Sequence, residues 1–122
     1  KTVTAPEGKR HITVAANAVV TITDCGDTGR LTGGDSTFGA AVNVARMGIF
    51  RMYGGSITGN HAKPTAATGL GGAVYLQAGN AAEAGAAFQM YGGSITENTG
   101  YRGGGICVAP GEEKPVKPAR TQ

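Results

Sequence analysis

Hydrophobic and polar residues alternate along this chain in short segments that are separated by glycines. An alternation with a period of two is typical of a β-strand with one buried face. It is clearest in five segments, 11–17, 19–23, 50–52, 73–76 and 105–108. No stretch keeps the 3.6-residue period of an amphipathic helix. Segment 78–87 is rich in alanine, but its two glycines predict a loop.

One eleven-residue segment occurs twice. Phe50–Asn60 returns as Phe88–Asn98, 38 residues later, with nine of eleven positions identical. A repeat at a fixed period indicates a stack of similar structural units. Three strand-like segments recur in order in these units, namely 50–52 with 88–90, 56–58 with 94–96 and a fainter 30–32, and 73–76 with 105–108 and a fainter 41–44.

Glycine accounts for 22 of the 122 residues, more than twice its average share of about 7%. The glycines cluster between the strand-like segments, at 54–55, 71–72, 92–93 and 103–105. Glycine accepts positive φ without steric cost, so these clusters predict sharp corners. The chain lacks the Gly-X-Y period of collagen.

Three short strands and glycine corners in each repeat predict an all-β fold, a single-stranded parallel β-helix of about three to four coils. Successive coils would stack at about 4.8 Å, which places equivalent side chains above one another. Pro110 would end strand pairing, so we expect the β-helix within residues 1–109. Residues 110–122 are rich in proline and lysine and predict a linker or tail.

The alternation assigns each strand residue to the interior or to the surface. We expect inward side chains at Phe50, Met52, Ile57, Val74, Leu76, Phe88, Met90, Ile95, Ile106 and Val108. We expect outward side chains at Arg51, Tyr53, Ser56, Thr58, Tyr75, Gln89, Tyr91, Ser94, Thr96 and Cys107. The asparagines that end the two long repeats, Asn60 and Asn98, predict a stacked turn.

The outward positions supply the candidate ligand-binding residues, which are Tyr53, Tyr91, Arg51 and Tyr75. Tyr53 would lie over Tyr91 beside Arg51, and exposed aromatic rings with polar neighbours hold sugar rings or protein partners. The alternative is that aromatic residues simply favour strands. The same alternative applies to a column of Thr32, Thr58 and Thr96, whose neighbouring column of Arg30, Ser56 and Ser94 is not a second threonine row.

The charged residues predict no catalytic residue, no metal site and no cofactor. Only Asp24, Asp27 and Asp35 could gather, near the first turn, as a calcium site or simply as turn caps. Neither long repeat places an acid on an outward strand position. His11 and His61 lack a second ligand at a metal-site spacing.

The two cysteines and the charge distribution limit other classes. Cys25 and Cys107 would lie in the first and last coils, farther apart than the ~7 Å that a disulfide allows, which favours thiols; a disulfide would mean a different coil count. The formal charge is +3 with scattered basic residues, which predicts no nucleic-acid partner. No segment approaches the ~20 apolar residues of a membrane helix, so we expect no membrane insertion.

These segments resemble a known family. Met52–Asn60 followed by Gly71–Tyr75 resembles the repeats of bacterial adhesin-like surface proteins, and is similar to the repeats of chlamydial polymorphic outer membrane proteins. The segment Asp24–Gly34 resembles the segment that often precedes such repeats. The resemblance covers roughly residues 12–108. It implies a right-handed β-helix of the pectin-lyase-like type and an extracellular location on the bacterial cell surface.

The resemblance and the outward ladders together predict a non-catalytic adhesin module that binds a host glycan or an extracellular protein through its side-chain ladders and corner loops. One alternative is a structural spacer without a ligand. A second is a fragment of a polysaccharide lyase-like enzyme. We expect the chain to continue into neighbouring repeats or domains of a larger protein.

Overall fold

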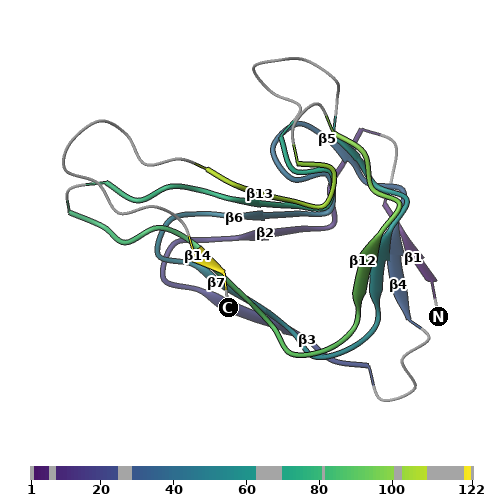
Figure 1. Ribbon diagram of the computed structural model, residues 1–122, viewed down its shortest axis with the longest axis horizontal. Helices are drawn as coiled ribbons and strands as arrows, with labels where there is room; N and C mark the ends of the chain where they lie inside the picture. The colour runs from purple at the N-terminus through teal and green to yellow at the C-terminus, as the bar shows by residue number, and fades with distance from the viewer. Residues whose placement is uncertain are drawn as a thin grey trace.

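The computed structural model describes residues 2–5, 8–24, 29–62, 70–80, 82–100, 103–109 and 120–121. Within these residues every regular element is a β-strand, and every strand pair is parallel. Figure 1 looks along the coil, and the strands lie over one another around a single interior. The chain is an all-β, right-handed parallel β-solenoid; the repeat predicts the parallel stack, and the resemblance implies its right-handed coil.

Three walls of four strands each enclose the interior. Wall A consists of β1 (Thr2–Thr4), β4 (Arg30–Thr32), β8 (Ser56–Thr58) and β12 (Ser94–Thr96). Wall B consists of β2 (Ile12–Val14), β6 (Val42–Val44), β10 (Val74–Leu76) and β13 (Ile106–Val108). Wall C consists of β3 (Val19–Ile22), β7 (Ile49–Met52), β11 (Ala87–Met90) and β14 (Arg120–Thr121). A short pair, β5 (Asp35–Ser36) with β9 (His61–Ala62), lies at the corner between walls A and B.

The two long repeats are adjacent layers of this solenoid. Phe88 pairs with Phe50 in wall C, and Ile95 pairs with Ile57 in wall A. The fainter segments take the predicted places below them, because 30–32 pairs with 56–58 and 41–44 contributes β6. The 38-residue offset of the sequence is therefore one full turn of the chain.

The interior is narrow and apolar. Its largest fully buried side chains include Phe50 and Phe88, whose rings stack with centroids 5.2 Å apart and an interplanar angle of 18°. The predicted inward face is confirmed by the buried cluster of walls A, B and C. Val108 has the inward phase but is 41% exposed, because β13 is the outermost of the described strands of wall B and pairs only with β10 among them.

Asn60 and Asn98 form the stacked turn that the sequence predicts. Asn60 is 1% exposed, and its Oδ1 accepts a hydrogen bond from the Gly34 amide at 2.8 Å. Its Nδ2 donates to the carbonyls of Leu31 and Thr58 and to Asn98 Oδ1 at 2.9 Å. Each amide thus joins its own turn to the neighbouring one, and together they close the backbone hydrogen bonds at this corner.

Glycine at the corners lets neighbouring turns approach closely, and Gly72 shows this best. A Cβ at Gly72 would lie 2.1 Å from the Gly104 carbonyl oxygen and 2.6 Å from that of Thr99. We expect Gly72→Ala to lower the free energy of unfolding by about 1–3 kcal/mol, because backbone must shift to admit the methyl group. Urea denaturation followed by circular dichroism measures the change.

Gly105→Ala is the matched control, since the nearest atom to its Cβ would be Ile95 Cγ2 at an ordinary 3.8 Å. An equal loss of stability in both variants would show that close approach at Gly72 is not what the corner requires.

The structure adds strands that the sequence pattern does not reveal. Strand β1 (Thr2–Thr4) begins wall A, and β14 (Arg120–Thr121) pairs with β11 within the segment 110–122 that predicts a linker or tail. Apart from Arg120 and Thr121, that segment lies outside the described residues. The loop before β11 contains no helix in its described residues, as predicted, and is organised by Asn80, whose Oδ1 accepts from the amides of Ala82 and Glu83.

Candidate surface site

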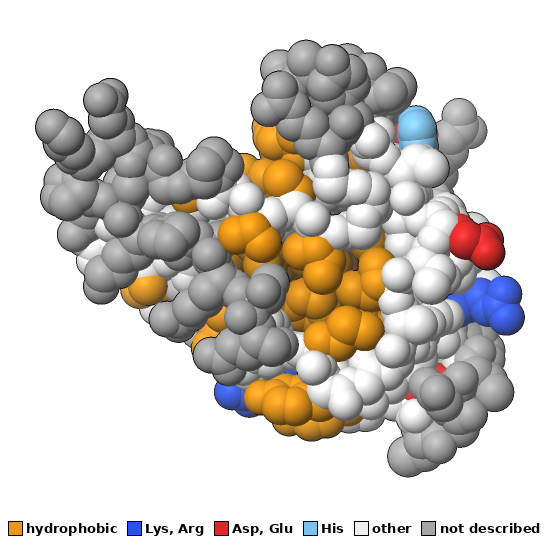
Figure 2. Space-filling view, in the orientation of Figure 1, with side chains coloured by type: hydrophobic (Ala, Val, Ile, Leu, Met, Phe, Trp, Pro, Cys, Tyr) orange, Lys and Arg blue, Asp and Glu red, His pale blue; other side chains and the backbone are white. Residues whose placement is uncertain are grey.

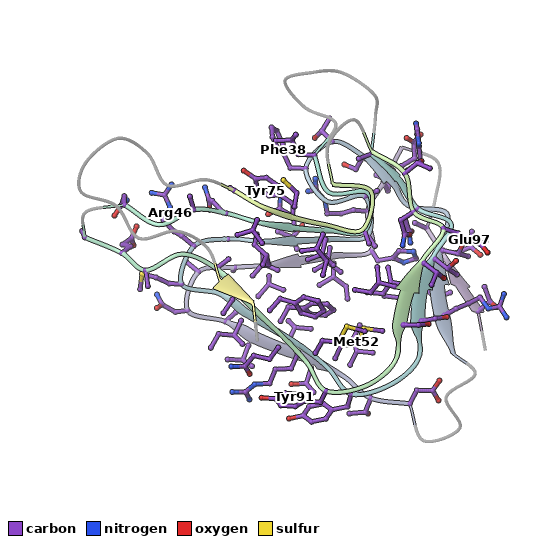
Figure 3. The ribbon with its side chains drawn as sticks, in the orientation of Figure 1. Phe38, Arg46, Met52, Tyr75, Tyr91 and Glu97 are labelled. Carbon is purple, nitrogen blue, oxygen red and sulfur yellow. The ribbon has the colours of Figure 1, made fainter. Side chains whose placement is uncertain are left out.

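Among the described residues, the most exposed aromatic side chains lie in a column just after wall C. Tyr53 follows β7 and Tyr91 follows β11, and their rings stack with centroids 4.8 Å apart and an interplanar angle of 13°. The two side chains are 48% and 61% exposed. Figure 3 shows Tyr91 pointing away from the interior. The stacking predicted for these two tyrosines is therefore confirmed as geometry.

Polar groups complete this column on wall C. Arg51 Nε donates to Gln89 Oε1 at 2.7 Å, and the Tyr91 hydroxyl donates to the same oxygen at 3.4 Å. We call Tyr53, Tyr91, Arg51 and Gln89 the tyrosine ladder. Because the rings cover one face of each other, the ladder offers ring edges, hydroxyl groups and a guanidinium to solvent. Such a mixture of apolar area and hydrogen-bonding groups suits a sugar or a protein loop.

Tyr75 does not belong to this surface. It lies on β10 in wall B, on the opposite side of the interior from Tyr91 (Figure 3). Its ring contacts that of Phe38, with centroids 5.1 Å apart at an angle of 59°. The four residues taken from the sequence as candidates therefore divide into two places, because successive walls of a coil face different directions.

Tyr75 instead lines a shallow hollow of about 250 Å³ together with Phe38, Asn43 and Gln77. Asn43 Nδ2 donates to the Phe38 carbonyl at 3.0 Å, and Gln77 Oε1 accepts from the Arg46 amide at 2.9 Å. Both amide side chains are thus held in place beside the rings. We call Phe38, Asn43, Tyr75 and Gln77 the aromatic hollow.

Burial raises the pKa of the Tyr75 hydroxyl above its usual value, and the neighbouring Cys107 raises it further, whereas Arg46 lowers it. The hydroxyl therefore stays protonated, and able to donate a hydrogen bond, to higher pH than a free tyrosine. Cys107 stands opposite Tyr75 in the β10–β13 pair. Cys25 lies outside the described residues, so the expected state of the two thiols stays a prediction.

The sequence pattern missed most of the aromatic hollow. Asn43 and Tyr75 occupy equivalent positions of the 41–44 and 73–76 segments, so the repeat register could have brought them together. Phe38 belongs to no strand, and its position depends on the corner after β5. No local pattern predicts such a contact.

A second, mainly apolar hollow of about 240 Å³ lies where wall C turns into wall A. It is lined by Val3, Ile22, Thr23, Asp24, Gly29, Arg30, Leu31, Met52, Gly54, Gly55, Ser56 and Ile57. In this turn the chain takes a longer path between β3 and β4 than the tight Gly54–Gly55 corner of the next turn.

The acidic residues that the sequence suggests as a calcium site or as turn caps do not converge in the described part of the chain. Asp24 accepts a hydrogen bond from the Gly29 amide at the corner between walls C and A, as expected of a turn cap. Asp35 lies on β5 at the corner between walls A and B, and Asp27 is outside the described residues. Among described residues, no group of three or more His, Cys, Asp or Glu side chains could hold a metal ion.

His11 and His61 each contact a residue of the neighbouring turn. His11 Nε2 lies 2.7 Å from the Thr32 carbonyl oxygen, and His61 Nδ1 contacts the Thr99 hydroxyl. Thr58 and Thr96 hydroxyls lie 3.5 Å apart in the threonine column of wall A. The neighbouring column contains Arg30, Ser56 and Ser94 in register, so wall A lacks a flat double row of threonine.

Comparisons with known proteins find no match for this chain. No protein-family model matches the chain, and no curated protein or solved structure matches it. In the described residues, no helix is both long and apolar enough to cross a membrane. Function must therefore be argued from the geometry of the surface.

Proposed function

We propose that this chain is a binding module of a bacterial cell-surface adhesin-like protein, and that the tyrosine ladder contacts a glycan or an extracellular protein. The observation that carries the proposal is the stacked pair of Tyr53 and Tyr91, which remain about half exposed beside Arg51 and Gln89. A large apolar area that is exposed to solvent is the kind of feature that marks an interaction surface.

The ladder is preorganised for contact. The rings are fixed against each other and Arg51 is held by Gln89, so binding would cost little side-chain entropy. A sugar ring can lie against the outer ring face of Tyr91 or along the ring edges, while hydroxyl groups of the sugar reach the tyrosine hydroxyls and the guanidinium. The same surface can hold a protein loop through the same contacts.

The test is a double variant, Tyr53→Ala with Tyr91→Ala, applied to an array of glycans and of host extracellular matrix proteins. We expect the wild-type chain to bind one class of these probes and the double variant to lose that binding. The stack contributes about 0.5–1.5 kcal/mol beyond area burial, so the variant should stay folded with a loss of about 1 kcal/mol in the free energy of unfolding.

The matched control is Thr58→Ala with Thr96→Ala, a pair of outward residues stacked in the same way on wall A. This control should keep the binding of the wild-type chain. Binding that survives loss of both tyrosines, or that is lost equally in the control, would contradict the ladder as the site.

A second candidate function is that of a structural spacer, and a specific observation favours it. Polar side chains of neighbouring turns pair with each other, as in Arg51 with Gln89 on the surface and Asn60 with Asn98 at the corner. Such pairing stiffens a wall without any ligand. A wild-type chain that binds nothing on the array, yet unfolds cooperatively, would favour the spacer. Cleavage of a pectin-like polymer in the presence of calcium would instead support the enzyme alternative.

A further inference from the structure

Two aromatic rings lie outside the core, on the outer side of wall B. Phe38 and Tyr75 do not belong to the core cluster of the described residues, whereas most hydrophobic side chains visible in Figure 2 gather between the walls. Figure 3 shows the two rings together on the outer side of the wall. Their planes meet at 59° with centroids 5.1 Å apart, so the rings form adjoining sides of the aromatic hollow. Aromatic area in this position is available to a ligand.

The hollow is built on the two middle strands among the described strands of wall B. Asn43 on β6 pairs with Tyr75 on β10. Arg10, just before β2, holds the corner that contains Phe38, because its Nη2 donates to the Phe38 carbonyl at 2.9 Å and its Nε donates to the Gly39 carbonyl at 3.0 Å. Asn43 Nδ2 donates to the same Phe38 carbonyl at 3.0 Å. The hollow is therefore preformed, and filling it costs little ordering of the chain.

Each amide side chain of the hollow uses one of its two polar atoms to hold the backbone. Asn43 uses Nδ2, and Gln77 uses Oε1, which accepts from the Arg46 amide at 2.9 Å. The other two atoms, Asn43 Oδ1 and Gln77 Nε2, have no hydrogen-bond partner among the described residues. Both atoms are accessible to solvent, since neither is a buried polar atom without a partner. The hollow thus presents one open acceptor and one open donor beside two rings.

We propose that the aromatic hollow binds one N-acetylated amino sugar. Its acetamido group carries an N–H, a C=O and a methyl group, which match Asn43 Oδ1, Gln77 Nε2 and the aromatic rings. Asn43 Oδ1 accepts from the acetamido N–H, and Gln77 Nε2 donates to the acetamido carbonyl. The sugar ring lies against Tyr75, as pyranose faces do on aromatic rings. This site is separate from the tyrosine ladder, which lies on the opposite side of the solenoid (Figure 3).

The spacing of the two amides fits a secondary amide. Gln77 continues the ladder of β10, since its backbone amide donates to the Val44 carbonyl at 3.0 Å. Positions 43 and 77 are therefore one strand apart across the wall and two residues apart along it, which is about 8 Å diagonally. A trans secondary amide directs its N–H and C=O to opposite sides. Two hydrogen bonds of about 2.9 Å, one on each side, span a similar distance.

The size and surroundings of the hollow favour one uncharged sugar over a peptide. Strand β10 pairs with both β6 and β13, so it offers no free edge to which an extended peptide could add. The volume of about 250 Å³ lies below the ~300–1,000 Å³ of sites for drug-sized ligands, which suits a single ring. None of the described residues that line the hollow is charged.

The Tyr75 hydroxyl supplies a further donor. It has no hydrogen-bond partner among the described residues. Burial raises the pKa of this hydroxyl, and the neighbouring Cys107 raises it further, although Arg46 lowers it. The group therefore stays protonated at neutral pH and can donate to a hydroxyl of the sugar.

The experiment titrates the ¹⁵N-labelled 122-residue chain with N-acetylglucosamine and follows the ¹H–¹⁵N NMR spectrum. We expect the side-chain amide signals of Asn43 and Gln77 to shift with one dissociation constant. Glucose and glucosamine have the same ring without the acetamido group, and should bind about tenfold more weakly because two hydrogen bonds are lost. N-methylacetamide, an amide without a sugar ring, should also bind at least tenfold more weakly.

Three variants locate the site. Gln77→Glu keeps an oxygen for the Arg46 amide but replaces the open donor by an acceptor, so we expect binding at least tenfold weaker. Tyr75→Ala removes one ring and should weaken binding about tenfold. Thr13→Ala is the matched control, because Thr13 is exposed and pairs with Asn43 in the same outward column; it should bind like the wild-type chain. Far-UV circular dichroism identical to that of the wild-type chain shows that each variant is folded.

Five results would overturn the proposal. The first is a wild-type chain whose spectrum does not change with N-acetylglucosamine, and the second is equal affinity for glucose. The third is undiminished binding by Gln77→Glu, which would place the sugar elsewhere, as on the tyrosine ladder. The fourth is equal affinity for N-methylacetamide, which would point to a peptide group as the ligand. The fifth is tighter binding of glucuronic acid, which would point to a carboxylate.

Discussion

Replacing Phe88 by alanine is expected to lower the free energy of unfolding by about 3–5 kcal/mol, the largest effect that we predict for one side chain. Phe88 is 1% exposed and stacks on Phe50 with ring centroids 5.2 Å apart. The walls around this core are held by parallel strand pairs, so they have few ways to close the cavity. Urea denaturation followed by circular dichroism measures the loss.

Phe88→Leu is the control, because it keeps most of the apolar volume and should cost less than about 1.5 kcal/mol if the core repacks. The two variants separate the volume of the side chain from its chemical identity. A loss below about 1 kcal/mol for Phe88→Ala would mean that the stacked pair is not what holds the second and third turns together.

Replacing Asn60 by alanine is expected to cost about 3 kcal/mol, although the residue is polar. Its side chain satisfies the buried Gly34 amide and the carbonyls of Leu31 and Thr58. Each buried group left without a partner costs about 1–3 kcal/mol, and the costs do not add fully. The same denaturation experiment measures the loss, with the wild-type chain as reference.

Asn98→Ala provides the comparison within the same column. Asn98 is only half-buried, and its Nδ2 donates to the Ile57 and Thr96 carbonyls, where water can take its place. We expect this variant to lose less than half of what Asn60→Ala loses. Equal losses in the two variants would show that burial does not set the energy of this amide ladder.

The repeat was the strongest predictor of the fold. Nine identical positions at a fixed offset left parallel stacking as the simplest arrangement, and the period-two alternation then assigned Phe50, Met52 and Ile57 to the interior. Both signals are local or pairwise, which is why they can be detected in one sequence. Strands β1 and β14 were missed because neither has a repeated partner segment. Each is recognised only from its pairing with β4 or β11 in the structure.

The sequence predicts only part of the candidate site, because only the tyrosine pair belongs to the long repeat. Tyr53 and Tyr91 occupy equivalent positions of the long repeat, so their contact follows from the 38-residue offset. Tyr75 also points outward, but the direction of its wall relative to the tyrosine ladder depends on the corners between the walls. Those corners are set by glycines and turns, whose geometry the alternation does not describe.

By itself, the sequence determined that this protein is a stack of parallel turns with an apolar interior, a tyrosine pair on the surface and an asparagine pair at a corner. These features depend on the spacing of residue types along the chain. The tertiary structure alone decided that Tyr75 meets Phe38, and that the tyrosine ladder and the aromatic hollow face opposite sides. These features depend on how each corner turns the chain, and that is fixed by close backbone contacts between turns distant in sequence.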